Sequence, residues 1–136
     1  MDLAVRDRAA RLDAVGPPPY AAGMDLPRTL SPGEAAAIRQ FVARVRELLG
    51  TELRHVRLFG SRARGEGHEH SDLDIALIVA PGGRARRYAV YDLAFDVGLE
   101  HSVDLAPLVL EEQQLQELKR RERLVALDIE REGIAL

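Results

Sequence analysis

The sequence predicts an α/β (α+β) domain with a small mixed β-sheet flanked by helices, and three observations lead to this expectation. Segments with apolar residues at helical spacing alternate with short apolar runs along the chain, an order typical of domains in which helices cover a sheet. A length of 136 residues suits one domain. The chain is 46% hydrophobic and 30% charged, as ordinary globular proteins are.

The first 30 residues are expected to form an extension ahead of the domain. A short helix is predicted over residues 3–15. It must end at the three prolines that begin at Pro17, because proline cannot continue a helix. Residues 16–30 are interpreted as a linker, and Met24 within it offers an alternative start of the protein. The domain itself is predicted to span residues 31–136.

A helix is predicted to begin directly after Ser31. Serine is a favourable N-cap, Pro32 fits the first helical turn, and Glu34 completes a capping box. Gly50 is expected to end the helix. The apolar residues that recur at the spacing of one buried helix face are Ile38, Phe41, Val42, Val45, Leu48 and Leu49.

Strands and helices are predicted to alternate through the rest of the domain. Runs rich in β-formers predict strands, and a Pro-Gly-Gly turn follows the second of them. In chain order the predicted elements are a strand at 54–59, a short helix through Arg64, a strand at 72–79, a helix at 84–99, a strand at 103–109 and one or two helices within 111–132. The large apolar residues about one turn apart in the fourth of these elements are Tyr88, Tyr91, Phe95 and Leu99.

The composition excludes several classes of protein. There is no cysteine, so disulfides and thiolate metal sites are excluded. No stretch approaches the roughly 20 apolar residues that span a bilayer, and alternating charges near the N-terminus oppose a signal peptide; we therefore expect a cytoplasmic location. The net charge of −3 opposes extended nucleic-acid binding. Residues 54–64, however, carry four arginines and no acid, which suits a small polyanion.

Two carboxylates stand two residues apart at the start of an apolar strand. Strand alternation puts the side chains of Asp72 and Asp74 on one face of the sheet. Two such charges about 4 Å apart would repel by roughly 4 kcal/mol at an effective dielectric of 20. A divalent cation would remove this penalty, and Mg²⁺ prefers oxygen ligands of this kind. The alternative is that both residues simply point into solvent where the strand begins.

A glycine and a serine follow the preceding strand. Gly60 and Ser61 would place backbone N–H groups and a hydroxyl where phosphate oxygens can bind. The alternative is a simple strand-to-helix turn in which the serine is an N-cap. Arg62 and Arg64 could neutralise a triphosphate, or they could form salt bridges with Glu66 and Glu69.

A third carboxylate, Asp104, lies in the apolar run of the last predicted strand. If buried, it needs a partner; the alternative is a solvent-facing position on an edge strand. A phosphate-holding turn, a pair of metal carboxylates and a third carboxylate are together the parts that phosphoryl transfer requires. This combination is more specific than any one of its members.

The runs Leu58-Phe59-Gly60-Ser61-Arg62-Ala63-Arg64-Gly65 and Ser71-Asp72-Leu73-Asp74-Ile75 closely resemble the minimal nucleotidyltransferases of the DNA polymerase β-like superfamily. The resemblance covers about residues 31–136, including the ending Arg131-Glu132-Gly133-Ile134. It implies the polymerase β-like nucleotidyltransferase fold and a metal-dependent, nucleotide-binding transferase. One departure is Gly67, where these proteins commonly have alanine.

The resemblance also implies a role for each residue of the two motifs. Gly60 and Ser61, with Arg62 and Arg64 beside them, would bind the phosphates of ATP. Asp72, Asp74 and Asp104 would be the catalytic residues and would ligate two Mg²⁺ ions. The third of these acids would also activate the attacking hydroxyl.

Proteins of this minimal kind often act beside a small helical HEPN protein as the antitoxin of a toxin–antitoxin pair. The resemblance therefore implies AMPylation, the transfer of AMP from ATP to a tyrosine of the toxin, within a hetero-oligomer. One alternative is a nucleotidyltransferase that acts on a small molecule or an RNA end. Another is a non-catalytic antitoxin that neutralises its partner by binding alone.

Two further sets of basic residues each have two interpretations. His68 and His70 could add a metal site or contact the nucleotide, although solvated loop histidines are the simpler interpretation. Arg84, Arg86 and Arg87 could form a basic edge near the substrate, although a solvated helix face is the simpler interpretation.

Overall fold

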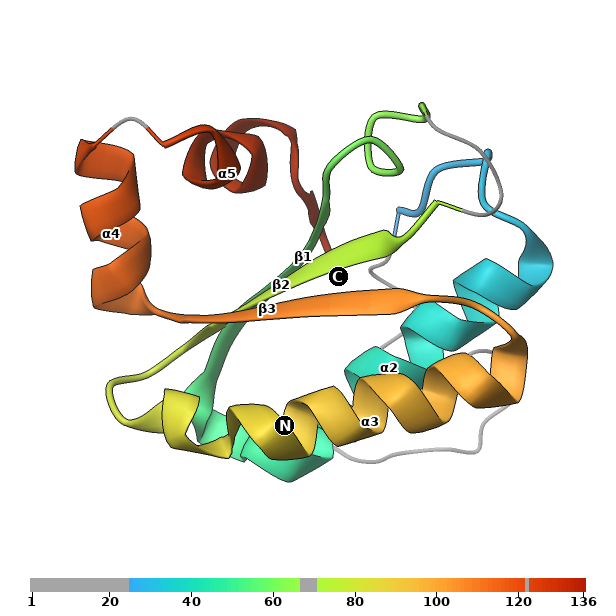
Figure 1. Cartoon of the computed structure of the whole chain (residues 1–136), viewed down its shortest axis with the longest axis horizontal. Coiled ribbons are helices and arrows are strands. Elements are labelled where there is room, and N and C mark those ends of the chain that lie inside the picture. The colour runs from blue at the N-terminus through green and yellow to red at the C-terminus, as the bar shows by residue number, and fades with distance from the viewer. Residues whose placement is uncertain (1–24, 67–70, 122) are drawn as a thin grey trace.

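The structure is a computed structural model that describes residues 25–66, 71–121 and 123–136. Its elements, labelled as in Figure 1, are α2 (Pro32–Leu49), η1 (Gly50–Glu52), β1 (Leu53–Phe59), β2 (Leu73–Val79), η2 (Gly83–Arg86), α3 (Arg87–His101), β3 (Leu105–Glu111), α4 (Glu112–Arg120), α5 (Leu124–Leu127), η3 (Asp128–Glu132) and β4 (Ile134–Ala135). The predicted helix over residues 3–15 and the loop histidines lie outside the described residues.

The strands form one mixed sheet in the order β3-β2-β1-β4, which confirms the predicted fold class. β1 and β2 are antiparallel, and β1 is also antiparallel to the short β4. β2 and β3 are parallel and are joined across the sheet by α3. Both faces of β2 are buried, one in each apolar cluster, which explains why nearly all its residues are apolar.

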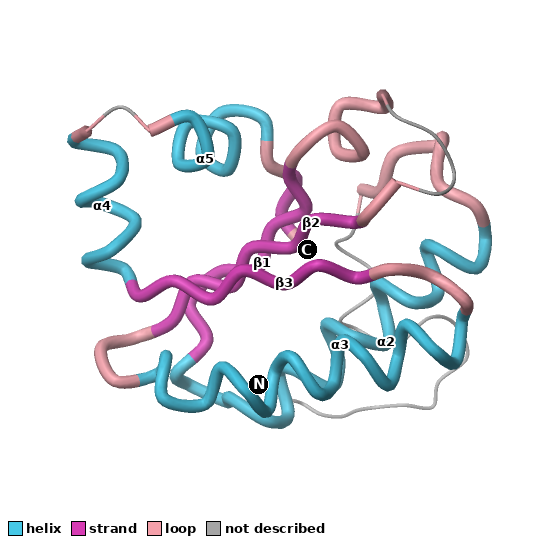
Figure 2. Tube along the Cα trace, in the orientation of Figure 1, coloured by secondary structure: helices cyan, strands magenta, loops and turns pink. Residues whose placement is uncertain are grey.

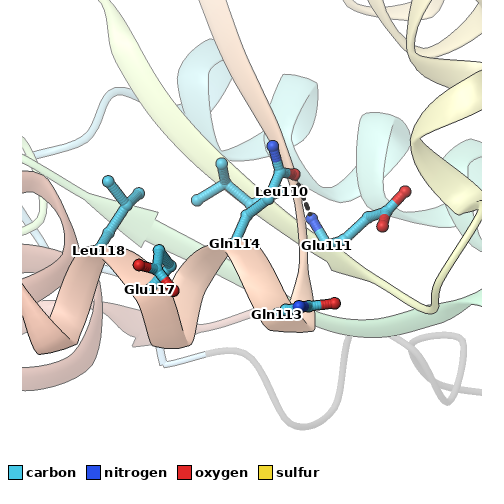
Figure 3. A pocket seen from close by; sticks show the side chains of 6 residues that line it. All are labelled: Leu110, Glu111, Gln113, Gln114, Glu117 and Leu118. Atoms are coloured by element: carbon cyan, nitrogen blue, oxygen red, sulfur yellow. Dashed lines mark hydrogen bonds between the residues drawn. The ribbon is translucent and has the colours of Figure 1, made fainter.

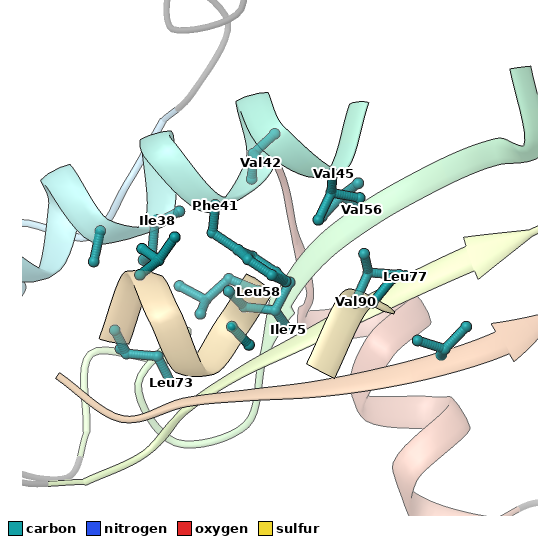
Figure 4. Packing of buried hydrophobic residues seen from close by; sticks show 14 of the residues in the cluster. Ile38, Phe41, Val42, Val45, Val56, Leu58, Leu73, Ile75, Leu77 and Val90 are labelled. Atoms are coloured by element: carbon teal, nitrogen blue, oxygen red, sulfur yellow. The ribbon is translucent and has the colours of Figure 1, made fainter. Parts of the chain in front are cut away.

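Helices cover both faces of this sheet (Figure 2). On one face, α2 and α3 pack against apolar side chains that alternate along β1 and β2 (Figure 4). A second, smaller cluster fills the other face beneath α4 and α5: Phe59, Ala76, Ile78, Leu110, Leu115, Ala126 and Ile129. The two clusters fix which side of each strand faces which layer, because strand side chains alternate between faces.

The first helix begins as its capping box predicts. The Ser31 hydroxyl accepts a hydrogen bond from the Glu34 backbone N–H (3.0 Å), and the Glu34 carboxylate accepts one from the Ser31 N–H (2.8 Å). Gly50 follows the last residue at a positive φ of 54°. The predicted apolar face is buried, with Phe41 fully inaccessible to solvent.

Most of the apolar stripe of α3 faces outward, and only Tyr91 of its four residues packs against the core. Tyr88, Phe95 and Leu99 are 65%, 67% and 66% exposed. Smaller side chains on the opposite side of the helix, among them Val90 and Ala94, contact the core instead. Large apolar residues at helical spacing therefore identified the helix but not its buried side.

Three local predictions are wrong. Residues 61–64 form successive turns and not a short helix, because the chain leaves β1 at Gly60 with a positive φ of 78°. Asp104 precedes β3 and is exposed, so it lies outside the strand in which it was expected. The strand Ile134–Ala135 was not predicted; two residues are too few to show a pattern in sequence.

The boundary predicted at residue 31 stays a proposal. Leu26 and Leu30, within the predicted linker, pack against the larger core cluster. In the part of the chain that the structure describes, no helix is long and apolar enough to cross a membrane.

Candidate active site

The three aspartates of the sequence motifs lie at one end of the sheet, where β1 ends and β2 and β3 begin. Asp74 is paired with Phe59 on β1 and with Ala106 on β3. The parallel register continues one residue beyond the strands, because the Leu73 N–H donates to the Asp104 carbonyl oxygen (2.9 Å). This register places Asp104 beside Asp72.

Asp74 points to the face of the sheet that α4 and α5 cover. Its ladder partner Phe59 and its strand neighbour Ala76 both belong to the cluster on that face. Asp72, two residues earlier, shares this orientation by alternation but is exposed, whereas Asp74 is half-buried. The arrangement therefore has one solvated and one sheltered carboxylate.

Burial raises the pKa of the Asp74 carboxyl, and the nearby Asp72 carboxylate raises it further. Both causes disfavour a second negative charge at this position. A bound cation reverses them, because it attracts both carboxylates and replaces the lost water. The electrostatics of the pair thus fit a site for a hard divalent ion.

Mg²⁺ commonly takes one or two protein carboxylates and completes its shell with water and substrate phosphates. Asp72 and Asp74 supply such a partial set. Within the described residues, no three Asp, Glu or His side chains form a complete metal-binding cluster. The oxygen donors of Asp72 and Asp74 fit a Mg²⁺ ion that is shared with the phosphates of a nucleotide.

Gly60 contacts the sheltered carboxylate directly. A Cβ atom placed on this residue would lie 2.6 Å from Asp74 Oδ2, which is too close for any side chain. The residue also has φ +78°, a conformation that other residues rarely adopt. The glycine of the motif is therefore required twice, for the turn and for the approach of the Asp74 carboxylate.

We expect Gly60→Ala to lose both stability and transfer activity. The positive φ should cost about 1–2 kcal/mol of unfolding free energy, and the displaced Asp74 carboxylate should lower kcat/KM by about 10²-fold. Gly82→Ala is the matched control, since Gly82 has φ +88° but nothing within 4 Å of the added methyl group. It should lose comparable stability and keep the activity. Equal activities of the two variants would show that the contact with Asp74 is unimportant.

Arg62 is placed differently from its predicted position against phosphate. Its side chain is 3% exposed and forms an ion pair with Glu34, with Nη2 2.7 Å from Oε1. Nη1 donates to the Ser71 carbonyl oxygen (3.0 Å). Glu34 and the Ser71 carbonyl group thus engage the buried guanidinium, which gives Arg62 a structural contribution. Contact between Arg62 and phosphate stays a prediction. The partner of Arg62 is Glu34, and sequence analysis did not associate Glu34 with the site.

Arg64 lies at the surface of the same turn. It forms ion pairs with Glu66 (3.2 Å) and with Glu132 (2.9 Å). The salt bridge with Glu66 is one of the two alternatives that the sequence left open. Its exposed position leaves contact with a nucleotide as a proposal.

The remaining arginines of the 54–64 stretch do not join one patch. Arg54, near the other end of β1, binds Glu112 (3.4 Å). Arg57 lines a pocket of about 110 Å³ beneath α4. The four side chains therefore lie in different surroundings, because strand alternation and burial separate residues that are close in sequence.

The predicted basic edge at residues 84–87 is also engaged by the protein itself. Arg84 donates a hydrogen bond to the Val109 carbonyl oxygen, and Arg86 donates one to the Leu48 carbonyl oxygen.

A larger pocket lies beside α4 (Figure 3). Leu110 and Glu111, which line it, end β3, whereas Asp104 precedes the start of that strand. The pocket has a volume of about 380 Å³. Its lining residues are Leu110, Glu111, Gln113, Gln114, Glu117 and Leu118. None of the motif residues lines this pocket, so we place the candidate site at the aspartates.

Comparison with known proteins identifies the family of the domain. Residues 38–130 match the family described as nucleotidyltransferase domain. A solved structure described as a candidate minimal nucleotidyltransferase is 28% identical; the match covers 74% of this chain and 91% of that chain, with a TM-score of 0.50. No protein of curated function matches the chain.

A structure described as a toxin–antitoxin with AMP-PNP is 21% identical; the match covers 71% of this chain and 69% of that chain, with a TM-score of 0.43. The matched family spans both motifs, Gly60-Ser61 and Asp72-Leu73-Asp74. The resemblance to minimal nucleotidyltransferases inferred from these motifs is confirmed. The chain belongs to the nucleotidyltransferase domain family.

Proposed function

We propose that this nucleotidyltransferase moves AMP from ATP to a hydroxyl group, with Asp72, Asp74 and Asp104 as its catalytic residues. The observation that carries the proposal is the convergence of these aspartates at one end of the sheet, with Gly60 against Asp74. The raised pKa of Asp74 supports it, because a carboxylate pair that repels in the free protein is suited to a cation.

Each residue has a defined part in the proposed reaction. The backbone N–H groups and hydroxyl of the Gly60-Ser61 turn, with Arg64 at its surface, hold the outer phosphates of ATP. Asp72 and Asp74, with Asp104 sharing one of the ions, would hold two Mg²⁺ ions, and these would neutralise the phosphate charge that develops in the transition state. These residues therefore fix the α-phosphorus in position.

Asp104 is proposed as the residue that accepts the proton of the acceptor hydroxyl. The hydroxyl oxygen then forms a bond to the α-phosphorus while the bond from that phosphorus to the pyrophosphate oxygen breaks. Pyrophosphate leaves with the electron pair of the broken bond. The products are an adenylylated hydroxyl and pyrophosphate, and the proton passes from Asp104 to solvent.

The acceptor is proposed to be a tyrosine of a partner toxin of the HEPN type. The resemblance to minimal antitoxins supports this choice. A pocket of about 240 Å³ beside the site also supports it, since exposed Phe95 and Leu99 line the pocket together with Asp104. Exposed apolar groups of this size suit contact with a protein better than contact with a small polar molecule.

The test is to incubate the protein with ATP, Mg²⁺ and the protein encoded by its neighbouring gene, and then to measure the mass of that second protein by mass spectrometry. We expect its mass to rise by one or more AMP units, and no rise with Asp72→Asn. Transfer of label from ATP to an RNA pool instead would identify an RNA-end enzyme. If the mass never rises and Asp72→Asn still neutralises the partner, the protein acts by binding alone.

A further inference from the structure

A buried network connects the two motifs of the candidate site to the first helix. Arg62, in the turn after β1, lies between Glu34 at the start of α2 and the residue that precedes Asp72. Both side chains of the ion pair are almost fully buried, at 3% and 5% exposure. Few charged groups in globular proteins are buried to this extent unless they are paired.

The network begins at a rigid point of the fold. The Glu34 oxygen that binds Arg62 also accepts the Ser31 N–H (2.8 Å), so the capping box and the ion pair share one carboxylate. Burial alone would raise the pKa of Glu34, but the hydrogen bonds from Arg62 and Ser31 hold it below its ordinary value. The carboxylate is therefore ionised at neutral pH, and α2 anchors it.

The other end of the network lies beyond the last paired residues of β1 and β2. The last ladder pair between β1 and β2 is Phe59 with Asp74. Ser61 and Asp72 both lie beyond it, so the β1–β2 ladder does not fix the distance between the phosphate turn and the exposed metal carboxylate. Arg62 spans this interval, because it belongs to the turn and donates to the Ser71 carbonyl oxygen.

We propose that Arg62 and Glu34 are positioning residues that hold the Gly60-Ser61 turn and Asp72 at the separation that a metal-bound nucleotide requires. Arg62 acts through the backbone of Ser71, not by contact with phosphate. A planar guanidinium suits this task, since its fixed donors reach two acceptors in different directions at once. The inference rests on the proposed function, whose metal and nucleotide sites it connects.

The main test replaces both partners with methionine. A buried ion pair can often be exchanged for apolar residues of similar volume without loss of stability, but Glu34→Met/Arg62→Met removes the bond to Ser71. We expect a lower melting temperature, because Glu34→Met also removes the capping box. At a temperature at which the variant is folded, we expect an approximately tenfold rise in the Mg²⁺ concentration that half-saturates ATP binding, measured by calorimetry. The exposed pair is the control: Arg44→Met/Glu100→Met should leave the Mg²⁺ midpoint unchanged.

A second variant covers the case in which the double substitution does not fold. Arg62→Lys keeps the charge next to Glu34 but not the rigid fork. At a temperature at which it is fully folded, its Mg²⁺ midpoint should also rise, whereas ATP binding without Mg²⁺ should not weaken. A loss of equal size with and without Mg²⁺ would indicate direct phosphate contact and overturn the proposal. So would unchanged midpoints in folded variants. Failure of the wild type to bind ATP with Mg²⁺ would instead contradict the proposed function.

Discussion

Replacement of either carboxylate of the metal pair should abolish nucleotide transfer while leaving the protein folded. Asp72→Asn and Asp74→Asn each remove one of the two charges that a divalent ion needs, so calorimetry should show no Mg²⁺-dependent gain in ATP binding. Transfer of label from ATP should fall to background. Asp92→Asn, an equal change at an exposed position of α3, is the control and should behave as the wild type.

The stability of Asp74→Asn provides a second, independent measurement. Burial and the Asp72 carboxylate raise the pKa of Asp74 in the folded state, so folding favours its protonated form. This contribution is fully present below the unfolded pKa of about 3.9 and is lost as the pH rises through the folded pKa. At pH 7 the ionised carboxylate therefore opposes folding, and Asn should remove that penalty.

We thus expect Asp74→Asn to melt at or above the wild-type temperature at pH 7, in metal-free buffer. The difference should shrink toward pH 4, where the wild-type carboxyl takes up its proton. A marked loss of stability at pH 7 would mean that the ionised carboxylate has a favourable partner in the free protein. Wild-type transfer by Asp72→Asn or Asp74→Asn would contradict the assignment of the metal pair.

Asp104→Asn should lose most of the transfer rate with much less effect on nucleotide binding. General-base assistance is typically worth 10²- to 10⁴-fold, and the same loss is expected in kcat at saturating ATP and Mg²⁺. The position of Asp104 before β3 motivates this separation, because Asp74 lies in the neighbouring strand β2 and Asp72 directly precedes that strand. Equilibrium binding of ATP with Mg²⁺ is the decisive comparison. A loss of affinity equal to that of Asp72→Asn would make Asp104 chiefly a metal ligand.

Part of the site could be predicted because its information is local. Alternation along an apolar strand places Asp72 and Asp74 on one face, whatever the rest of the fold does. The capping box at Ser31 likewise depends on residues three positions apart, and it forms as predicted. The contact between Gly60 and the Asp74 carboxylate was not predicted, because it joins the turn after β1 to a different strand, β2.

Other features depend on which elements pack together, and a single sequence does not contain that information in a local pattern. The basic stretch after residue 53 was expected to act as a unit. The alternating faces of β1, the burial of Arg62 and the ion pairs of Arg64 separate its members. The stripe on α3 identified a helix, but its buried side carries Val90 and Ala94, which pack into the larger core cluster.

By itself, the sequence determined the fold class, the family motifs and the pairing of two carboxylates, since each follows from residue types at short, fixed spacing. Only the tertiary structure decided that Asp104 lies beside Asp72 and that Arg62 is bound to Glu34, 28 positions away in the chain. The physical reason is that strand register and buried charge pairing are set by long-range packing. The ion-pair partner of a buried charged residue is therefore known only from the folded structure.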